Sequence, residues 1–164
     1  MKPWPNIQGR NGVNIAPEKI AYLFNNVENI VAVKEASGNI SQVAKIMQLT
    51  DGKIDLYSGN DDQIIPLLSV GGKGCISVLS NLMPAESHDM VARFLSGDIS
   101  GAAKLQFDLL PLIHALFSEV NPIPVKAAMA AMGYCHDIVR APLTTMEPET
   151  REILYARMRE LNLI

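Results

Sequence analysis

The sequence predicts an α/β fold in which parallel strands alternate with helices, followed by an all-helical region. Three short apolar runs alternate with segments of helical periodicity through about the first hundred residues. Three further segments of helical periodicity follow, and no strand pattern separates them. We therefore expect a single domain over residues 1–164, with a leading loop and helix over 1–28, parallel βα units over 29–99 and helices over 100–164.

The first two expected strands are short and apolar. One covers residues 29–34, whose β-branched and almost continuously apolar side chains are typical of a strand buried on both faces. Helical spacing of apolar residues follows over 41–49, and the second strand is expected over 54–57. Asp61 and Asp62 come next and are expected to cap a helix, because carboxylates stabilise the amino end of a helix.

The third expected strand covers residues 75–79 and leads to a helix that begins at Pro84 and is closed by Gly97. Residues 1–12 are rich in Pro, Asn and Gly and are expected to form a loop. Three parallel strands cannot close a barrel, and an open sheet leaves two unpaired edges. The sequence is therefore interpreted as part of a larger fold. The helices of the last region are expected over 100–119, 124–132 and 147–163.

Composition excludes several classes of partner. The chain has 48% hydrophobic and 19% charged residues, which is typical of globular proteins. A formal net charge of −3 indicates no nucleic acid, and no apolar run approaches the ~20 residues that span a bilayer. Cys75 and Cys135 lie in apolar surroundings and are expected to be reduced core residues of a cytoplasmic protein. The three histidines have no metal-ligand spacing, so no metal is expected.

Lys34 is the residue that points most directly to chemistry. It ends an apolar strand, so its aliphatic stem is expected to lie in an apolar interior. Burial there would favour the neutral amine by lowering the pKa of the side chain. A neutral amine is the nucleophile that attacks a ketone to form an imine. The alternatives are an ion pair with a carboxylate such as Glu35, or an ammonium group that reaches the surface.

The segments at the ends of the next two strands are expected to lie beside Lys34. Residues 58–60 (Ser-Gly-Asn) follow the second strand, and Ser77 occupies a corresponding place in the third. Active sites of parallel α/β folds collect at the carboxyl ends of the strands. Gly59 would let backbone groups approach a small ligand closely, although a strand-terminating turn also explains a glycine there.

Several motifs together resemble the dihydrodipicolinate synthase family. The resemblance runs from about Asn6 to the end of the chain. It implies a partial TIM (β/α)8 barrel, holding the last three βα units, followed by an all-helical C-terminal region. The matching stretches follow in the family's order and spacing: Gly-Arg-Asn-Gly at 9–12, Val-Ala-Val-Lys-Glu-Ala-Ser-Gly-Asn at 31–39, Tyr-Ser-Gly-Asn-Asp-Asp at 57–62, Gly-Cys-Ile-Ser-Val-Leu-Ser-Asn at 74–81 and Asn-Pro-Ile-Pro-Val-Lys at 121–126.

The resemblance also implies the chemistry. The family's strand lysine, here Lys34, forms an imine with pyruvate. The resulting enamine attacks aspartate semialdehyde to give 4-hydroxy-tetrahydrodipicolinate in lysine and diaminopimelate biosynthesis. Arg10 matches the arginine that binds the carboxylate of the aldehyde substrate, and Gly59 and Ile76 match positions that line the pyruvate pocket. No metal or organic cofactor is implied, and a homo-oligomer is expected because most members are homotetramers.

Two departures limit what the resemblance implies. The chain covers only the carboxy-terminal half of the family's barrel, so a chain that supplies the other half is one partner to consider. The family's proton-relay tyrosine is replaced by Pro5, so synthase activity of the chain alone is expected to be impaired. Two alternatives stay open. One is a sister pyruvate-dependent aldolase for N-acetylneuraminate or 2-keto-3-deoxy sugar acids, and the other is an inactive remnant that acts only through assembly.

Overall fold

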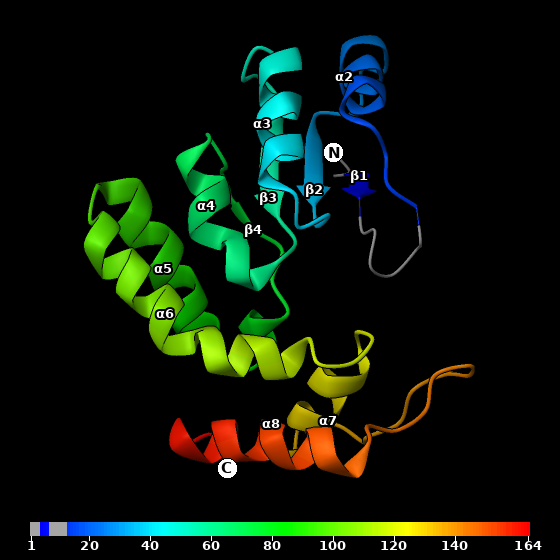
Figure 1. Cartoon of the computed structure of the whole chain (residues 1–164), viewed down its shortest axis with the longest axis vertical. Helices are drawn as coiled ribbons and strands as arrows, with labels where there is room; N and C mark the ends of the chain where they lie inside the picture. Colours follow the sequence, from blue (N-terminus) through cyan, green and yellow to red (C-terminus); the bar gives the residue numbers. More distant parts are fainter. Residues whose placement is uncertain (1–3, 7–12) are drawn as a thin grey trace.

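The computed structural model describes the backbone of residues 4–6 and all of residues 13–164 (Figure 1). In this part of the chain four parallel strands form one sheet in the order β1-β2-β3-β4. Each strand pairs with the one that follows it in the chain, as a series of βαβ units predicts. The strands are β1 (Trp4–Asn6), β2 (Ala32–Glu35), β3 (Asp55–Ser58) and β4 (Gly74–Cys75).

Two expectations about the sheet are wrong. The expected loop over residues 1–12 contains β1, an edge strand, and proline is tolerated at an edge because its missing N–H needs no partner there. The third expected strand, over 75–79, is reduced to the two residues of β4. The N–H groups of Val78 and Leu79 donate to the Asp61 carboxylate instead of a neighbouring strand. The chain then enters the 3-10 helix η2 (Leu79–Asn81).

Three helices follow the first three strands: α2 (Pro17–Asn26), α3 (Ile40–Leu49) and α4 (Ile64–Ser69). The Asn39 side chain caps α3 by accepting a hydrogen bond from the Gln42 N–H at 3.1 Å. Asp61 and Asp62 begin the 3-10 helix η1 (Asp61–Gln63), and neither side chain caps a helix. Their expected capping role is wrong, because the backbone of the β4–η2 segment takes the Asp61 carboxylate.

One apolar cluster joins the sheet to α2, α3 and α4, which lie along it in Figure 1. Burying an aliphatic side chain of this size stabilises a fold by about 1.5–3 kcal/mol. The cluster therefore fixes the positions of β2 and β3, from which Lys34 and Gly59 are presented. Its buried members are Ile20, Val33, Val43, Ile46, Ile54, Leu56 and Leu67.

The last region is helical, as the sequence predicts. Gly97 closes α5 in the left-handed conformation with a φ of 95°, which glycine adopts without steric cost. A second apolar cluster includes Leu116 of α6 and Leu154 of α8, and α8 lies beneath α6 in Figure 1. Among the described residues no helix is long and apolar enough to cross a membrane. The helices are α5 (Pro84–Ser96), α6 (Ile99–Leu116), α7 (Ile123–Ala131) and α8 (Pro148–Glu160).

Candidate active site

The backbone of β2 presents Lys34 on the face of the sheet opposite to its two neighbours. Val33 and Glu35 are buried, at 0% and 2% exposure, while Lys34 is half-buried. Successive side chains of a strand alternate between faces, so Lys34 and Glu35 point in opposite directions. The Glu35 carboxylate accepts hydrogen bonds from the Ser37 N–H at 2.6 Å and from the Gln42 side chain at 3.3 Å. Glu35 therefore holds the segment that leads into α3, while Lys34 points away from it on the opposite face of the sheet.

Gly59 packs against the stem of Lys34. A Cβ atom at position 59 would lie 2.7 Å from Lys34 Cε, 3.1 Å from Lys34 Cγ and 2.7 Å from Ala36 Cβ. Real Cβ atoms do not approach other carbon atoms this closely. The Gly59 N–H donates to the Glu35 carbonyl at 2.7 Å, which holds the turn after β3 against the end of β2. The structure thus brings Lys34 and Gly59 together, and the missing side chain of Gly59 makes the space that the lysine occupies.

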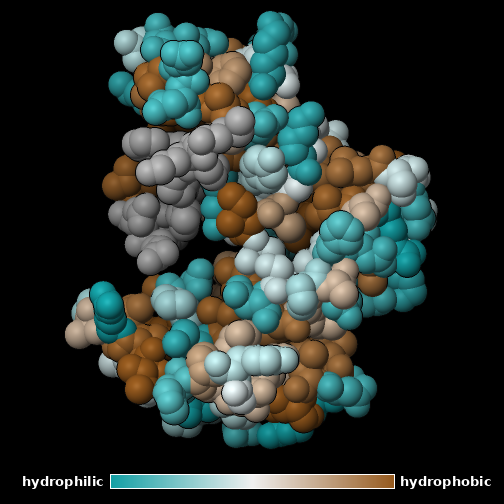
Figure 2. Space-filling view, turned by 180° about the vertical axis from the view of Figure 1, so that it is seen from behind, coloured by the Kyte–Doolittle hydropathy of each residue, from teal (hydrophilic) through white to brown (hydrophobic). Residues whose placement is uncertain are grey.

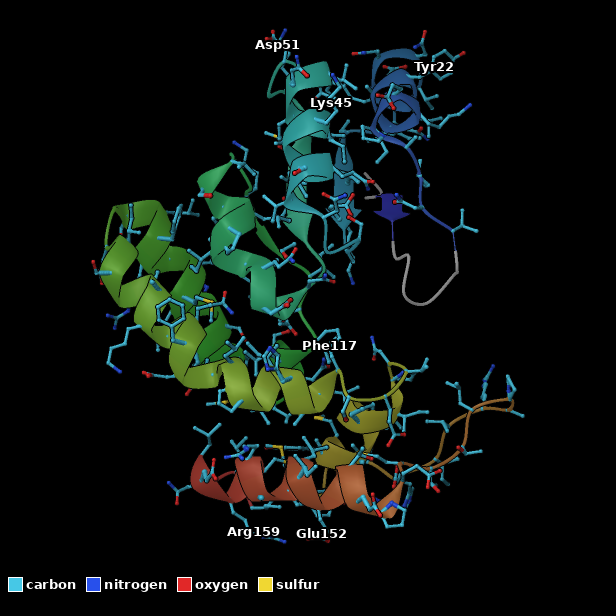
Figure 3. The ribbon with its side chains drawn as sticks, viewed as in Figure 1. Tyr22, Lys45, Asp51, Phe117, Glu152 and Arg159 are labelled. Atoms are coloured by element: carbon cyan, nitrogen blue, oxygen red, sulfur yellow. The ribbon has the colours of Figure 1, made fainter. Side chains whose placement is uncertain are left out.

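A cavity of about 450 Å³ opens beside these two residues. Figure 2 shows the surface hollowed between the part of the molecule that holds the sheet and the helical part. Phe117, labelled in Figure 3, lies where α6 ends and contributes to the far wall. The cavity is lined on the strand side by Lys34, Ala36, Gly59 and Asn60, and on the other side by Val78 and residues 117–121.

The segment over 117–121 is held in place by Glu119. Its carboxylate accepts a hydrogen bond from the Glu147 N–H at 3.1 Å and another from the Thr150 hydroxyl, at the start of α8. Sequence reasoning missed this wall. Its signal was the Asn-Pro-Ile-Pro stretch at 121–124, which the sequence offered as part of a family motif but not as a cavity wall.

Asp61 is the second functional candidate that sequence reasoning missed. Its side chain is 1% exposed, and burial raises the pKa of its carboxyl group. The Ser77 hydroxyl, two backbone N–H groups and the Lys34 ammonium act in the opposite direction and favour the carboxylate. A signal was present, because Asp61 directly follows the Ser-Gly-Asn turn, but it was assigned to a helix cap.

Comparison with known proteins identifies the family. A model of the dihydrodipicolinate synthetase family matches residues 5–161. The chain belongs to this family. The 4-hydroxy-tetrahydrodipicolinate synthase of Lachnoclostridium phytofermentans is 52% identical over 159 residues, which are 97% of this chain and 54% of that protein. The 4-hydroxy-tetrahydrodipicolinate synthase of Caldicellulosiruptor saccharolyticus is 57% identical over 149 residues, which are 91% of this chain and 50% of that protein.

Solved structures of dihydrodipicolinate synthases have the same fold. That of the Thermotoga maritima protein has a TM-score of 0.92 at 38% identity, and the match covers 98% of this chain and 55% of that chain. The fold class predicted from the sequence, a partial TIM barrel followed by an all-helical region, is confirmed. The chain spans about half the length of the curated relatives it matches.

The remaining residues that the family resemblance singled out have different positions. The Ile76 side chain is 37% exposed, and its N–H donates to the Ser58 carbonyl at 2.7 Å, next to the end of β3. Arg10 lies outside the described residues. Pro5 is the Cα partner of Lys34 in the β1–β2 register, so a residue without a hydroxyl group occupies the neighbouring place on β1. Among the described residues no cluster of His, Cys, Asp and Glu could hold a metal ion.

Proposed function

We propose that Lys34 forms an imine with pyruvate, and that the chain takes part in condensing pyruvate with aspartate semialdehyde to 4-hydroxy-tetrahydrodipicolinate. The observation that carries this proposal is the packing of the Lys34 stem against Gly59 at the wall of a cavity of about 450 Å³. The names of relatives that are 52% and 57% identical support the choice of substrates.

The proposed reaction uses a neutral Lys34 amine. Its nitrogen attacks the ketone carbon of pyruvate, and the carbonyl oxygen leaves as water to give the imine. Loss of a proton from the methyl carbon gives an enamine, whose carbon forms a bond to the aldehyde carbon of the second substrate while the aldehyde oxygen takes up a proton and becomes a hydroxyl group. The amine of aspartate semialdehyde then attacks the imine carbon, which closes the ring and releases Lys34 as the free amine. The proposal assigns Gly59 and Ile76 to the pyruvate pocket and Arg10 to the carboxylate of aspartate semialdehyde.

The proline beside the lysine limits the expected rate. General acid–base help from a positioned side chain is typically worth 10²–10⁴-fold. Pro5, which pairs with Lys34 across the β1–β2 register, has no ionisable group. We therefore propose that this chain forms the imine and the enamine more slowly than a relative with a tyrosine at this place, by roughly that factor.

Borohydride trapping tests the proposal. The chain is incubated with pyruvate, reduced, and digested so that peptide mass locates the adduct. A stable adduct on Lys34 is expected, and Lys34→Ala should abolish it. Lys45→Ala is the matched control, because Lys45 is an exposed lysine on α3 whose ammonium group donates to Gln48 (Figure 3). Folded protein that gives no adduct on Lys34 would contradict the proposal. Turnover with aspartate semialdehyde, compared with sugar acids, then separates a synthase from a sister aldolase.

We also propose that the chain self-associates in the cytoplasm. Several large apolar side chains are exposed, among them Phe107 at 68% and Tyr134 at 69%. Exposed apolar surface favours contacts with other chains. Size measurement by light scattering over a range of concentrations tests this. A monomer that unfolds cooperatively at every concentration would argue against self-association and against a role through assembly alone.

A further inference from the structure

Asp61 is a buried carboxylate that the proposed imine chemistry does not use. Its Oδ2 atom accepts the N–H of Val78 at 2.9 Å and the N–H of Leu79 at 2.8 Å. Its carbonyl oxygen accepts a hydrogen bond of 2.7 Å from the Gln106 side chain of α6. Burying a carboxylate is costly unless other groups compensate for the lost water. The Asp61 side chain is therefore fixed by two backbone N–H groups at Oδ2, and its backbone is fixed by Gln106.

That position connects the two walls of the lysine cavity. Gly59 and Asn60, which directly precede Asp61, line the cavity on the strand side with Lys34. Val78, whose N–H donates to the Asp61 carboxylate, lines the cavity from the other side. The Asp61 side chain therefore joins the turn after β3 to the segment after β4, and both segments bound the space next to the amine.

The carboxylate also acts on Lys34 through its charge. Burial raises the pKa of the Asp61 carboxyl group, and the Lys34 ammonium acts in the opposite direction by favouring the carboxylate. Electrostatic coupling between two sites is reciprocal, so the Asp61 carboxylate favours the ammonium form of Lys34 by the same free energy.

Other titratable and polar groups also lie near this place, among them Tyr57, the Cα partner of Lys34 on β3. From β4 the Cys75 thiol faces Asp61, but burial and the carboxylate raise the pKa of that thiol to about 11, so it is neutral at physiological pH. From α6 the neutral amide of Gln106 faces Asp61. Across the cavity, the Glu119 carboxylate accepts hydrogen bonds from the start of α8.

We propose that Asp61 is a positioning residue of the cavity beside Lys34. Asp61 holds the segment around Val78 in place, and its negative charge stabilises the ammonium form of Lys34. This inference rests on the proposed role of Lys34 in imine formation. Asp61 sets the pH at which the amine becomes nucleophilic, and it keeps the two walls at the separation that the substrate requires.

Competitive labelling of Lys34 with acetic anhydride across pH tests the inference without pyruvate. Only the neutral amine reacts, so the midpoint of the labelling profile reports the pKa of Lys34. Removing the nearby negative charge with Asp61→Asn should lower this midpoint, because the ammonium form of Lys34 loses the carboxylate that favours it. Asp62→Asn is the matched control, because Asp62 is the exposed neighbour and should leave the midpoint unchanged. A purely structural role would change the extent of labelling without moving the midpoint. An unmoved midpoint in folded Asp61→Asn protein therefore overturns the inference.

A second variant covers the case in which Asp61→Asn does not fold. Lys34→Met should raise the pKa of Asp61, followed through its carboxyl carbon resonance by NMR, and an unchanged pKa would overturn the inference. Pyruvate trapping separates the two hypotheses. A shifted labelling midpoint in Asp61→Asn, with no trapped adduct in the unsubstituted chain, would refute the proposed function and support the role of Asp61. Normal trapping with an unshifted midpoint would do the reverse.

Discussion

Replacing Gly59 with alanine tests whether contact between the β3 turn and β2 builds the lysine site. The new Cβ atom would lie 2.7 Å from both Lys34 Cε and Ala36 Cβ. Ordinary contacts between carbon atoms are about 3.5–4.0 Å, so these atoms must separate by roughly 0.8 Å or more. The flexible Lys34 side chain can rotate away, whereas the Ala36 Cβ moves only with the backbone that follows β2. The substitution should therefore disturb both the fold and the amine.

The two effects have different magnitudes. Inserting a methyl group into a packed site without room typically costs about 1–3 kcal/mol, and we expect Gly59→Ala to lower the free energy of unfolding by that amount. A misplacement of about 1 Å costs a reacting group on the order of 10²-fold in rate. We therefore expect pyruvate adducts to form on Lys34 about 100-fold more slowly in this variant.

Two further variants serve as a control and separate the contact with Ala36 from the contact with Lys34. An alanine Cβ at Gly74 would lie 3.7 Å from the nearest atoms of Tyr57, so Gly74→Ala should retain the stability and trapping rate of the unsubstituted chain. The double variant Gly59→Ala/Ala36→Gly removes the rigid contact but keeps the contact with Lys34. It should regain stability in urea denaturation and remain slow in borohydride trapping. Gly59→Ala protein with unchanged stability and an unchanged trapping rate would refute the reasoning.

Three other predictions concern the thiol, the helical core and the cavity wall. Because the pKa of Cys75 is raised to about 11, iodoacetamide should alkylate this thiol at pH 8 far more slowly than it alkylates free cysteine. The rate should rise about tenfold per pH unit up to that pKa, and equal rates at pH 8 would contradict the prediction. In urea denaturation, Leu154→Ala in α8 should lower the free energy of unfolding by about 2–5 kcal/mol, because Leu154 is fully buried. Ile153→Ala, at a position that is 56% exposed, should change the free energy of unfolding by about 0.5 kcal/mol at most. Glu119→Ala should cost about 1 kcal/mol by removing the acceptor at the start of α8, and an unchanged denaturation midpoint would exclude this role.

Local sequence patterns predicted most helices, β2 and β3. Helical periodicity and the closing Gly97 act within a few residues, so their signals are visible in the chain itself. β1 escaped prediction because a three-residue edge strand that contains proline has almost no local pattern. Its existence depends on pairing with β2, which is distant in the sequence.

The sequence by itself also pointed to Lys34 as the candidate for the proposed chemistry, because a lysine at the end of an apolar strand and the family motifs around it are local features. Only the tertiary structure decided what surrounds that lysine. The contact of Gly59 with Lys34 and the hydrogen bond from the Val78 N–H to Asp61 join residues on different strands and turns. Such contacts depend on how the sheet and helices pack together. In the sequence, the same residues fit an ordinary turn or a helix cap, so the local pattern does not reveal the contacts.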